Sequence, residues 1–296
     1  MKFLKYILLI PLIFLFSSCE DVIKVNVKQG EPKLVVDAFV NNLPRKQLIR
    51  LTRSNPYFAT PGTEPAVTGA TVAILDTSDI SNPKLFVFAD SGNGNYIFKP
   101  NPSTGDTFTV GRNYALVVID GTDTLMSLSR LNPTAKIDSL HLQYEDGTSS
   151  AFKKGKYVEM KANDLTGAGN YYWIKTYNND TFLNRIFDIN ISEDMGATGN
   201  SQDGGEFIWP VRYGALNDFQ KPRTSGAKVR VELHSISRET YFWFNLVINE
   251  NQNGGLFATP PANIGTNLFP FNPAKKIPVA GFFCMSAVSV AEVVIP

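Results

Sequence analysis

The feature that most constrains the fold of this chain is a series of strand-length runs in which apolar residues alternate with polar ones. Turn residues interrupt the series roughly every ten positions, a spacing typical of β-sandwich proteins. Seven such runs lie between residues 33 and 131: KLVVDAFV, KQLIRLTR, ATVAILD, KLFVFAD, NYIFKP, NYALVVID and TLMSLSRL. The composition agrees, because 21 Phe and 11 Tyr supply the aromatic side chains that strands favour. Residues 33–132 are therefore predicted to form an immunoglobulin-like or transthyretin-like β-sandwich.

Two local signals support this prediction. SGNGN (91–95) places glycines and asparagines, which accept positive φ, between two of the runs, and it predicts a tight hairpin. Tyr114 lies at the start of a strand and follows the turn glycine Gly111. This arrangement predicts a tyrosine corner, in which the phenol bonds back to the backbone of the preceding loop.

A break in the alternation at LNPTAKIDS (131–139) marks the predicted domain boundary, so residues 133–296 are expected to form a second β-rich domain. Its predicted strands include KYVEMKAND, NYYWIKTYN and GAKVRVELHSIS. In the last of these, the two valines and Leu233 are expected to point inward, and Arg230, Glu232 and His234 outward. The fold class is thus mainly β, with two β-rich domains in sequence.

One short helix is expected in the second domain. Ser237 is a residue type that caps helices, and RETYFWFNLVINEN (238–251) has the length of a helix that ends before Gly254. The aromatic content of this segment also suits a strand, so both alternatives stay open. AGFFCMSAVSVAEVVI (280–295) is expected to supply one or two closing strands.

Residues 1–18 have the layout of a signal peptide, with two lysines before an apolar run that is too short to span a bilayer. Two serines lead directly into Cys19, a pattern that resembles a bacterial lipobox. In such a protein Cys19 becomes the first residue of the mature chain and carries lipid on its sulfur, and residues 19–32 form a tether. The alternative is a secreted protein whose cysteine is incidental. The lipoprotein prediction implies attachment to a membrane by the lipid anchor.

Cys284 is the only other cysteine, and it lies in an apolar run where a cysteine is most often a small buried hydrophobe. We therefore expect no disulfide. Removing the two lysines of the leader from 28 basic residues leaves 26 against 27 acidic residues. This balance provides no basic field for a nucleic acid partner.

No motif for catalysis or metal binding stands out. The two histidines have no cysteine or second histidine at ligand spacing, and nucleophile elbows, phosphate loops and dinucleotide fingerprints are missing. An EF-hand reading that begins at Asp188 fails, because Glu193 stands where a glycine is needed. An irregular calcium site is the weaker alternative to a solvated polar loop, and its ligands would be Glu193, Asp194, Asp203 and Glu206. We expect a non-catalytic protein with no cofactor and no resident metal.

Residues 178–226 are rich in Gly, Asn, Asp and Ser, and long polar loops on a rigid β scaffold are where binding usually occurs. The alternative is an insertion with no role.

Aromatic side chains supply the candidate binding residues. On the strand just before this segment, Tyr171, Trp173 and Tyr177 share one face, and Tyr172 and Ile174 share the other. If the second face is buried, the three aromatics form a stacking surface for sugars or a docking patch; otherwise they are core. Within the polar segment, Trp209 and Tyr213 are the second candidates.

Several stretches, taken in order, resemble a family of Bacteroidota lipoproteins catalogued as domain of unknown function 4249. They are CED at the mature start, KLVVDAFV, GNGNY, GRNYALVVIDG, IDSL, VRVELHSISRETYFWF, PPANIGTNL and AGFFCMSA. The resemblance covers nearly all of the mature chain.

This resemblance implies a location and a partner. Such proteins look like accessory lipoproteins of TonB-dependent outer-membrane transporters, which sit on the outer leaflet and help to capture an unknown nutrient. In that setting Glu20 and Asp21 look like a signal for export to the cell surface. The resemblance supplies no catalytic residues. The alternative function is a structural or adhesive surface lipoprotein with no transporter partner.

Overall fold

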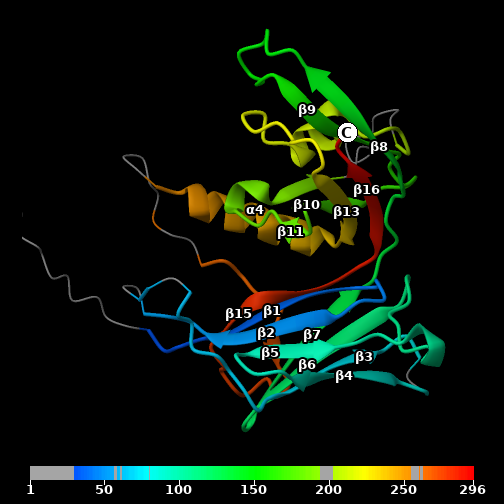
Figure 1. Cartoon of the computed structure of the whole chain (residues 1–296). Coiled ribbons are helices and arrows are strands. Elements are labelled where there is room, and N and C mark those ends of the chain that lie inside the picture. The colour runs from blue at the N-terminus through cyan, green and yellow to red at the C-terminus, as the bar shows by residue number, and fades with distance from the viewer. Residues whose placement is uncertain are drawn as a thin grey trace, which may run out of the picture.

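The alternating runs fold into a nine-stranded sheet, which forms the lower lobe in Figure 1. In sheet order the strands are β14 (Phe269–Pro270), β7 (Asp123–Arg130), β6 (Asn113–Asp120), β3 (Thr71–Asp76), β4 (Lys84–Asp90), β5 (Asn95–Phe98), β2 (Gln47–Arg53), β1 (Leu34–Asn41) and β15 (Val279–Ser286). The computed structural model describes residues 30–56, 59–60, 62–79, 81–193, 203–254, 260 and 263–296. The predicted signal peptide and the predicted anchor residues Cys19, Glu20 and Asp21 lie outside the described residues.

The lower sheet folds over into two layers, with β1, β2 and β15 above and β3, β4 and β6 below in Figure 1. The two ends approach each other where the Met285 N–H donates to Ser129 Oγ at 2.9 Å. Buried side chains from both layers share one core, which includes Val36, Phe86 and Leu116. The prediction of a mainly β fold is confirmed.

The two local signals of the lower lobe are also confirmed. The turn between β4 and β5 falls in SGNGN, and Gly94 has a φ of 73°. A Cβ at Gly94 would lie 2.2 Å from the Leu51 carbonyl oxygen, so this position needs glycine. The Tyr114 hydroxyl accepts from the Thr109 N–H at 2.7 Å and donates to the Thr109 carbonyl at 3.3 Å, which is the predicted tyrosine corner.

The upper lobe contains a second sheet, a hairpin and the helices. The sheet order is β11 (Thr181–Phe182), β10 (Tyr171–Asn178), β13 (Lys228–Ile236) and β16 (Val288–Val294), with β12 (Asn190–Glu193) also paired to β10. The hairpin consists of β8 (Ile137–Glu145) and β9 (Gly155–Ala162). The helices are α3 (Trp209–Arg212) and α4 (Arg238–Gln252), with short 3-10 turns η3 (Ile186–Asp188) and η4 (Gly214–Leu216). A further 3-10 turn, η2 (Pro102–Thr104), belongs to the lower lobe, between β5 and β6.

Helix α4 settles the open alternative for its segment in favour of a helix. The Ser237 side chain accepts a hydrogen bond from the Thr240 N–H at 3.2 Å, as an N-cap does. Its Phe244 packs against Trp173 of β10, with ring centroids 4.7 Å apart. The sheet of the upper lobe is therefore covered on both faces, with α4 on one face and the hairpin side on the other (Figure 1).

The C-terminal region contributes one strand to each lobe. β15 pairs in parallel with β1, with Leu34 opposite Val279, and β16 pairs antiparallel with β13. The lower sheet therefore takes strands from both sides of the predicted boundary near Pro133. A parallel pair between the two ends of a chain fixes the first and last regions together.

The outward orientation predicted for Glu232 and His234 is wrong. Glu232 is fully buried and His234 is 1% exposed, because this face of β13 packs against the lower lobe. Arg45, which follows β1, donates to both carboxylate oxygens of Glu232 at 2.6 and 2.7 Å. The Tyr177 hydroxyl lies 3.2 Å from the same carboxylate, and His234 links it to Ser286 of β15.

These contacts set the ionisation of the buried groups. Burial by itself raises the pKa of Glu232, but the contacts from His234 and Arg45 outweigh it and hold that pKa well below its usual range. Burial, together with the nearby Lys175, lowers the pKa of His234 to about 3, although Glu232 opposes this shift. Burial also lowers the pKa of Lys175 to about 8, although Glu232 opposes this shift.

Removing the arginine from this pair is expected to weaken the protein. Arg45→Met should lower the free energy of unfolding by about 2–3 kcal/mol, because it leaves a buried carboxylate with fewer partners. The loss is smaller than for a wholly buried pair, since the Arg45 side chain is 38% exposed. Urea unfolding of the purified protein measures it. Lys275→Met is the matched control, because its 2.9 Å pair with Asp123 is exposed and should cost less than about 1 kcal/mol. Equal losses would contradict a special role for Glu232.

The buried histidine predicts a pH dependence with a defined sign. In the unfolded chain His234 gains a proton near pH 6.5, but in the folded protein it stays neutral until about pH 3. The unfolded state therefore binds more protons in this window, and stability falls as the pH drops from about 6.5, by up to about 1.4 kcal/mol per pH unit. Glu232 adds a loss only at lower pH, through its own depressed pKa. His234→Gln should flatten the profile between pH 6.5 and 5 in urea titrations; an unchanged slope there would contradict the assignment.

Candidate ligand-binding site

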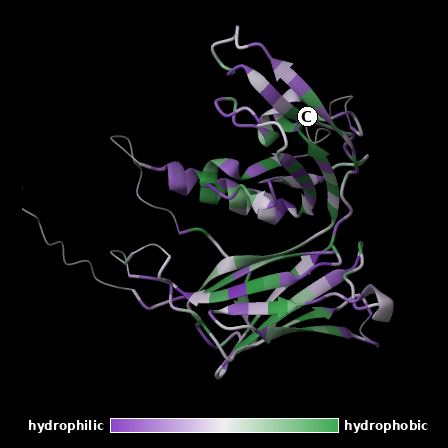
Figure 2. Cartoon of the chain, viewed as in Figure 1, coloured by the Kyte–Doolittle hydropathy of each residue, from purple (hydrophilic) through white to green (hydrophobic). Residues whose placement is uncertain are grey.

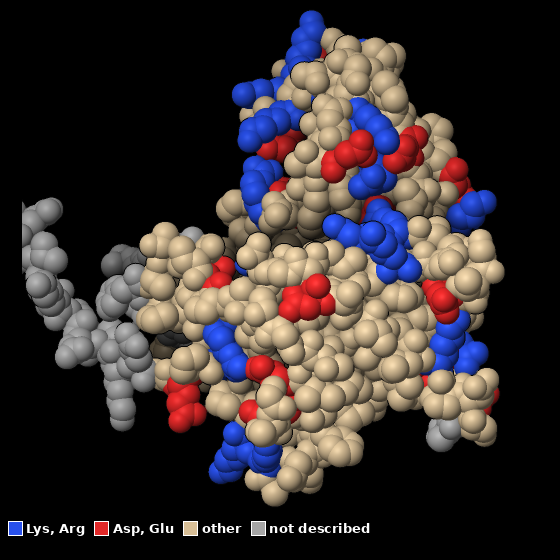
Figure 3. Space-filling view, turned by 60° about the horizontal axis from the view of Figure 1, so that its bottom comes forward, with Lys and Arg blue, Asp and Glu red and all other residues tan. Residues whose placement is uncertain are grey.

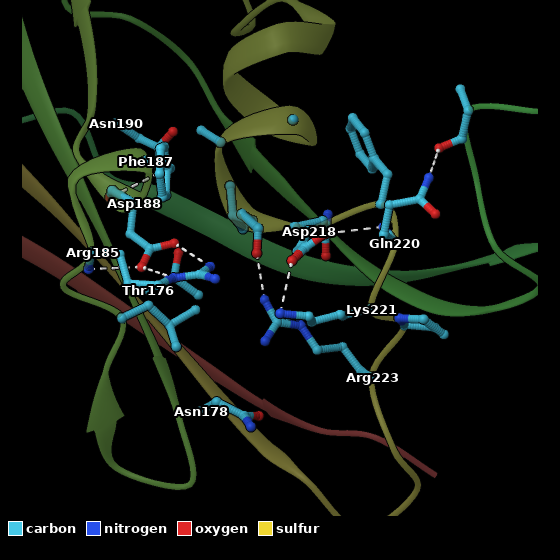
Figure 4. Close-up of a pocket in the computed structure, with 18 of the residues that line it drawn as sticks. Thr176, Asn178, Arg185, Phe187, Asp188, Asn190, Asp218, Gln220, Lys221 and Arg223 are labelled. Atoms are coloured by element: carbon cyan, nitrogen blue, oxygen red, sulfur yellow. Dashed lines mark hydrogen bonds and ion pairs between the residues drawn. The ribbon is translucent and has the colours of Figure 1, made fainter. Parts of the chain in front are cut away.

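A cavity of about 740 Å³ lies in the upper lobe beside the end of β10 (Figure 4). Two stretches of the long polar segment, residues 183–190 and 214–224, form most of its wall. Thr176 and Asn178 of β10 line it as well. Cavities that hold small ligands commonly measure about 300–1,000 Å³, so this one has the size for a small molecule.

The first wall is closed by one ion pair. The Arg185 guanidinium donates to the two carboxylate oxygens of Asp188 at 2.9 and 2.8 Å, and the Arg185 N–H also donates to Asp188 at 2.9 Å. These bonds from Arg185 lower the pKa of Asp188 despite its partial burial. Between the two residues, Phe187 is 73% exposed while it also lines the cavity, which places its ring at the rim.

The second wall is fastened to strand β9. The Asn217 side chain accepts from the Val158 N–H at 3.1 Å and donates to the Val158 carbonyl at 2.7 Å, as a neighbouring strand would. Further along, Arg223 donates from its guanidinium to the Leu216 carbonyl. Burial lowers the pKa of Arg223, and Asp218 and Asp188 offset the shift only in part. Figure 4 shows Arg223 and Lys221 extending from this wall into the site.

Two side chains at the strand side of the cavity carry buried polar atoms that have no hydrogen-bond partner among the described residues. These atoms are Thr176 Oγ1 and Asn178 Oδ1. Leaving such an atom unpaired costs roughly 1–3 kcal/mol, so most proteins satisfy them. Both residues line the cavity, but these two oxygens are themselves buried, so they mark strain in the wall and not a surface presented to a ligand.

A second surface feature lies on the lower lobe, on the layer of β4, β3, β6 and β7 that faces away from α4. Residues directly opposite in an antiparallel register share a face, and the outward set pairs Leu85 with Leu75, Leu75 with Ala115, and Ala115 with Leu128. Twelve residues of the outward set form one uncharged stretch: Leu85, Val87, Ala89, Thr71, Ala73, Leu75, Ala115, Val117, Ile119, Thr124, Met126 and Leu128. We call it the outer apolar face.

The outer apolar face meets solvent, and its twelve residues carry no charge. At the end of β6 and β7 it borders Asn113 and the exposed Arg130, which lie opposite each other on the same side of the sheet. Leu85, Val87 and Leu128 are 57%, 56% and 60% exposed. Figure 2 colours the lower strands of this lobe largely as hydrophobic, and Figure 3, with the bottom of the molecule brought forward, shows a broad area of the lower lobe nearly free of charged side chains. Soluble monomers rarely expose contiguous apolar patches of this kind, so it has the character of a contact surface.

The predicted stacking surface on β10 does not form, because both faces of this strand are covered. Tyr172 and Ile174 are buried against the hairpin side, and Trp173 is only 8% exposed beneath α4. On the same face as Trp173, the half-buried Tyr171 packs against Tyr241 of α4, with centroids 5.2 Å apart. Tyr177 lies under the Arg230 guanidinium, 3.9 Å from its carbon, and reaches Glu232. These three residues therefore hold the lobes and α4 together.

The second pair of candidates lies behind the cavity wall. Trp209 is 46% exposed, whereas Tyr213 is buried and donates to Glu145 at 3.0 Å. Burial, followed by that hydrogen bond, raises the pKa of Tyr213. Both rings pack on Phe219, which itself lines the cavity, with centroids 5.8 and 5.7 Å away. Trp209 is thus the one sequence-predicted aromatic that is both exposed and next to the cavity.

A Ser–His–Glu chain exists, but its environment is structural. Ser286 Oγ lies 2.9 Å from His234 Nδ1, and His234 Nε2 lies 3.2 Å from Glu232. All three side chains are buried, none lines the cavity, and a pKa of about 3 leaves His234 a weak base. A general base in catalysis needs a pKa near the working pH and access to substrate, so this chain is suited to joining the lobes.

The weaker calcium alternative involves residues that the structure uses separately. Asp203 accepts from the Gly167 N–H at 2.9 Å, and Glu206 pairs with Lys161 at 2.9 Å. Asp194 lies outside the described residues. Within the described part of the chain, no group of three or more His, Cys, Asp or Glu side chains is placed to hold a metal ion.

The polar segment predicted from the sequence supplies most of the cavity wall, but the individual residues that line the cavity were not predicted. Arg185, Asp188 and Arg223 match no motif, and the segment stood out only by its polar composition. A spacing rule cannot find them, because two separate loops and one strand bring them together.

Comparison with known families gives one match. A family model described as "Domain of unknown function (DUF4249)" matches residues 20–292, which is most of the chain. A search of curated proteins found no match. Among the described residues, no helix is both long enough and apolar enough to cross a membrane.

The ion pair of the first wall yields a testable prediction. Arg185→Met removes the two hydrogen bonds from the guanidinium to Asp188. It should speed amide hydrogen exchange across residues 183–190 by severalfold, because the side-chain ion pair that holds this turn is lost. Hydrogen exchange with mass spectrometry measures this. Exchange at residues 113–120 of the lower lobe serves as the internal control and should not change. Unchanged protection of the wall would show that other contacts hold it.

Proposed function

Because the chain belongs to the DUF4249 family, whose description names no activity, we propose its function from its own sequence and geometry. We propose that it is a non-catalytic lipoprotein of the outer membrane that faces the cell exterior. In this role it acts as an accessory to a TonB-dependent transporter and helps to capture a small nutrient.

The observation that carries this proposal is the outer apolar face. Covering a largely apolar sheet surface, with Leu85, Val87 and Leu128 exposed, by another protein lowers the free energy by about 25 cal/mol for each Å² of apolar area removed from water. An accessory protein needs such a lasting contact with its transporter. In a protein without a partner, the same exposed surface would promote aggregation.

The cavity supports the capture part of the proposal. It lies in the upper lobe, whereas the outer apolar face is on the far side of the lower lobe (Figure 1). A partner on the lower lobe therefore leaves the cavity accessible. The leader and Cys19 support the location, since a lipid anchor holds the mature chain at a membrane surface while the lobes stay in water.

The proposal predicts that one substitution on the outer apolar face separates the protein from its partner. Val87→Lys places a charge on that face without touching the core, and it should remove a co-purifying barrel protein when the lipidated protein is isolated in mild detergent from its own outer membrane. Mass spectrometry identifies the partner. Val294→Lys is the matched control, because Val294 is 61% exposed on a strand of the upper lobe. Retention of the barrel by both variants would exclude the face as the contact.

The same isolation separates the two candidate functions. A TonB-dependent barrel in equal amounts with the unaltered protein supports the accessory role. Recovery of the lipoprotein alone, under conditions that preserve known barrel complexes, favours the structural or adhesive alternative.

The anchor has its own prediction. Cys19→Ala should release the protein from the membrane fraction or block its maturation, because the thioether attachment point is gone. Fractionation and intact mass measure this, and Cys284→Ala is the control, since that thiol is buried. Normal fractionation and mass of the Cys19 variant would refute the lipoprotein assignment.

A further inference from the structure

The charges that line the cavity do not balance. The Arg185 guanidinium donates two hydrogen bonds to the Asp188 carboxylate. Lys221 Nζ lies 3.7 Å from Asp218 Oδ2. Each of these cations has a carboxylate partner. Arg223 differs, because no carboxylate of the described residues lies within 4.0 Å of its guanidinium.

The single side-chain hydrogen bond that Arg223 makes in the described structure goes to a neutral group, the Leu216 carbonyl. Its Nε is buried and has no partner among the described residues. A guanidinium has five N–H donors in a planar fork that matches a carboxylate or a phosphate. The fork at Arg223 is therefore underused.

Burial makes a cation with so few partners costly. Arg223 is largely withdrawn from water, and the resulting loss of hydration lowers its pKa, which shows that the nearby Asp218 and Asp188 do not fully compensate the charge. A buried cation is stabilised when an anion and further hydrogen bonds reach it. The wall of a cavity is the place where a ligand can supply both.

The rest of the cavity restricts the kind of anion. Its volume of about 740 Å³ exceeds the needs of an inorganic ion and suits an organic molecule. Thr176 and Asn178 are polar residues on the strand side, and the exposed ring of Phe187 stands at the rim. A ligand with hydroxyl groups and one apolar face would meet all three, because sugar rings stack on aromatic rings.

We propose that this cavity binds a small hydroxylated organic anion, whose carboxylate or phosphate group pairs with Arg223. The inference rests on the proposed function only in that the captured nutrient is taken to be this ligand. The ion pair between Arg223 and the ligand needs no partner protein, so it can be tested on this protein alone.

The test uses the purified lipidated protein in detergent with three sugar probes of similar size: gluconate, glucose 6-phosphate and uncharged glucose. Isothermal titration and thermal shift should detect binding of at least one anionic probe and at least about tenfold weaker binding of glucose, since one charged hydrogen-bonded pair exceeds 1.4 kcal/mol. The carboxylate and phosphate arms distinguish which anionic group the cavity prefers. Equal binding of all three probes, or no binding of either anion, overturns the proposal.

Variants locate the contact. Arg223→Gln should weaken binding of the preferred anion at least about tenfold, because it removes the charged fork. The unliganded protein should melt no lower than the parent, since the substitution removes a buried cation without a carboxylate partner. Arg223→Lys keeps the charge and should bind with intermediate affinity. Arg50→Gln, at an exposed arginine of the lower lobe, is the control for net charge and should bind normally. Equal weakening by Arg50→Gln and Arg223→Gln overturns the assignment to Arg223.

Failure here is distinguishable from failure of the accessory role. The titrations need no partner, and the isolation from the membrane needs no sugar. A barrel partner without anion binding would retain the accessory function and remove this ligand class. Anion binding without a barrel partner would establish the site in a protein that works alone.

Discussion

The structure depends on one buried carboxylate. Glu232 lies at the centre of β13 with no exposure to solvent, and Arg45 reaches it from a loop 187 residues earlier in the chain. Tyr177 and His234 bind the same carboxylate, and His234 continues to Ser286 of the lower sheet. A charge in this position is tolerated only when its partners are in place, so the two lobes are held in one relative position. The neighbouring strand β10, which pairs with β13, supplies Thr176 and Asn178 to the wall of the cavity.

The two sheets differ in which of their surfaces are covered by other parts of the chain. Both faces of β10 are covered by other parts of the chain. Trp173 and Tyr171 therefore pack within the protein and offer no surface on which a ligand could stack. The outer apolar face remains exposed on the lower lobe, and the cavity remains on the upper lobe. The two surfaces therefore lie on different lobes, so occupancy of one leaves the other accessible, as the proposed function requires.

Features that depend on nearby residues could be predicted from the sequence. The SGNGN turn, the tyrosine corner at Tyr114 and the cap at Ser237 all use partners within a few positions, so their spacing carries the information. The orientation of Glu232 and His234 could not be predicted in this way. Alternation along β13 separates its two faces, but whether the polar face meets water depends on Arg45 and on β15, far away in the chain.

The sequence by itself determined the mainly β class, the family and the segment that supplies the cavity walls, because hydrophobic periodicity, turn chemistry and motif order are local. Only the tertiary structure decided that β15 joins β1, that the second face of the upper sheet is buried, and that Arg223 reaches the cavity without a carboxylate beside it. The reason is physical: desolvation and charge compensation depend on the groups that surround a side chain in space, and those groups come from distant parts of the chain.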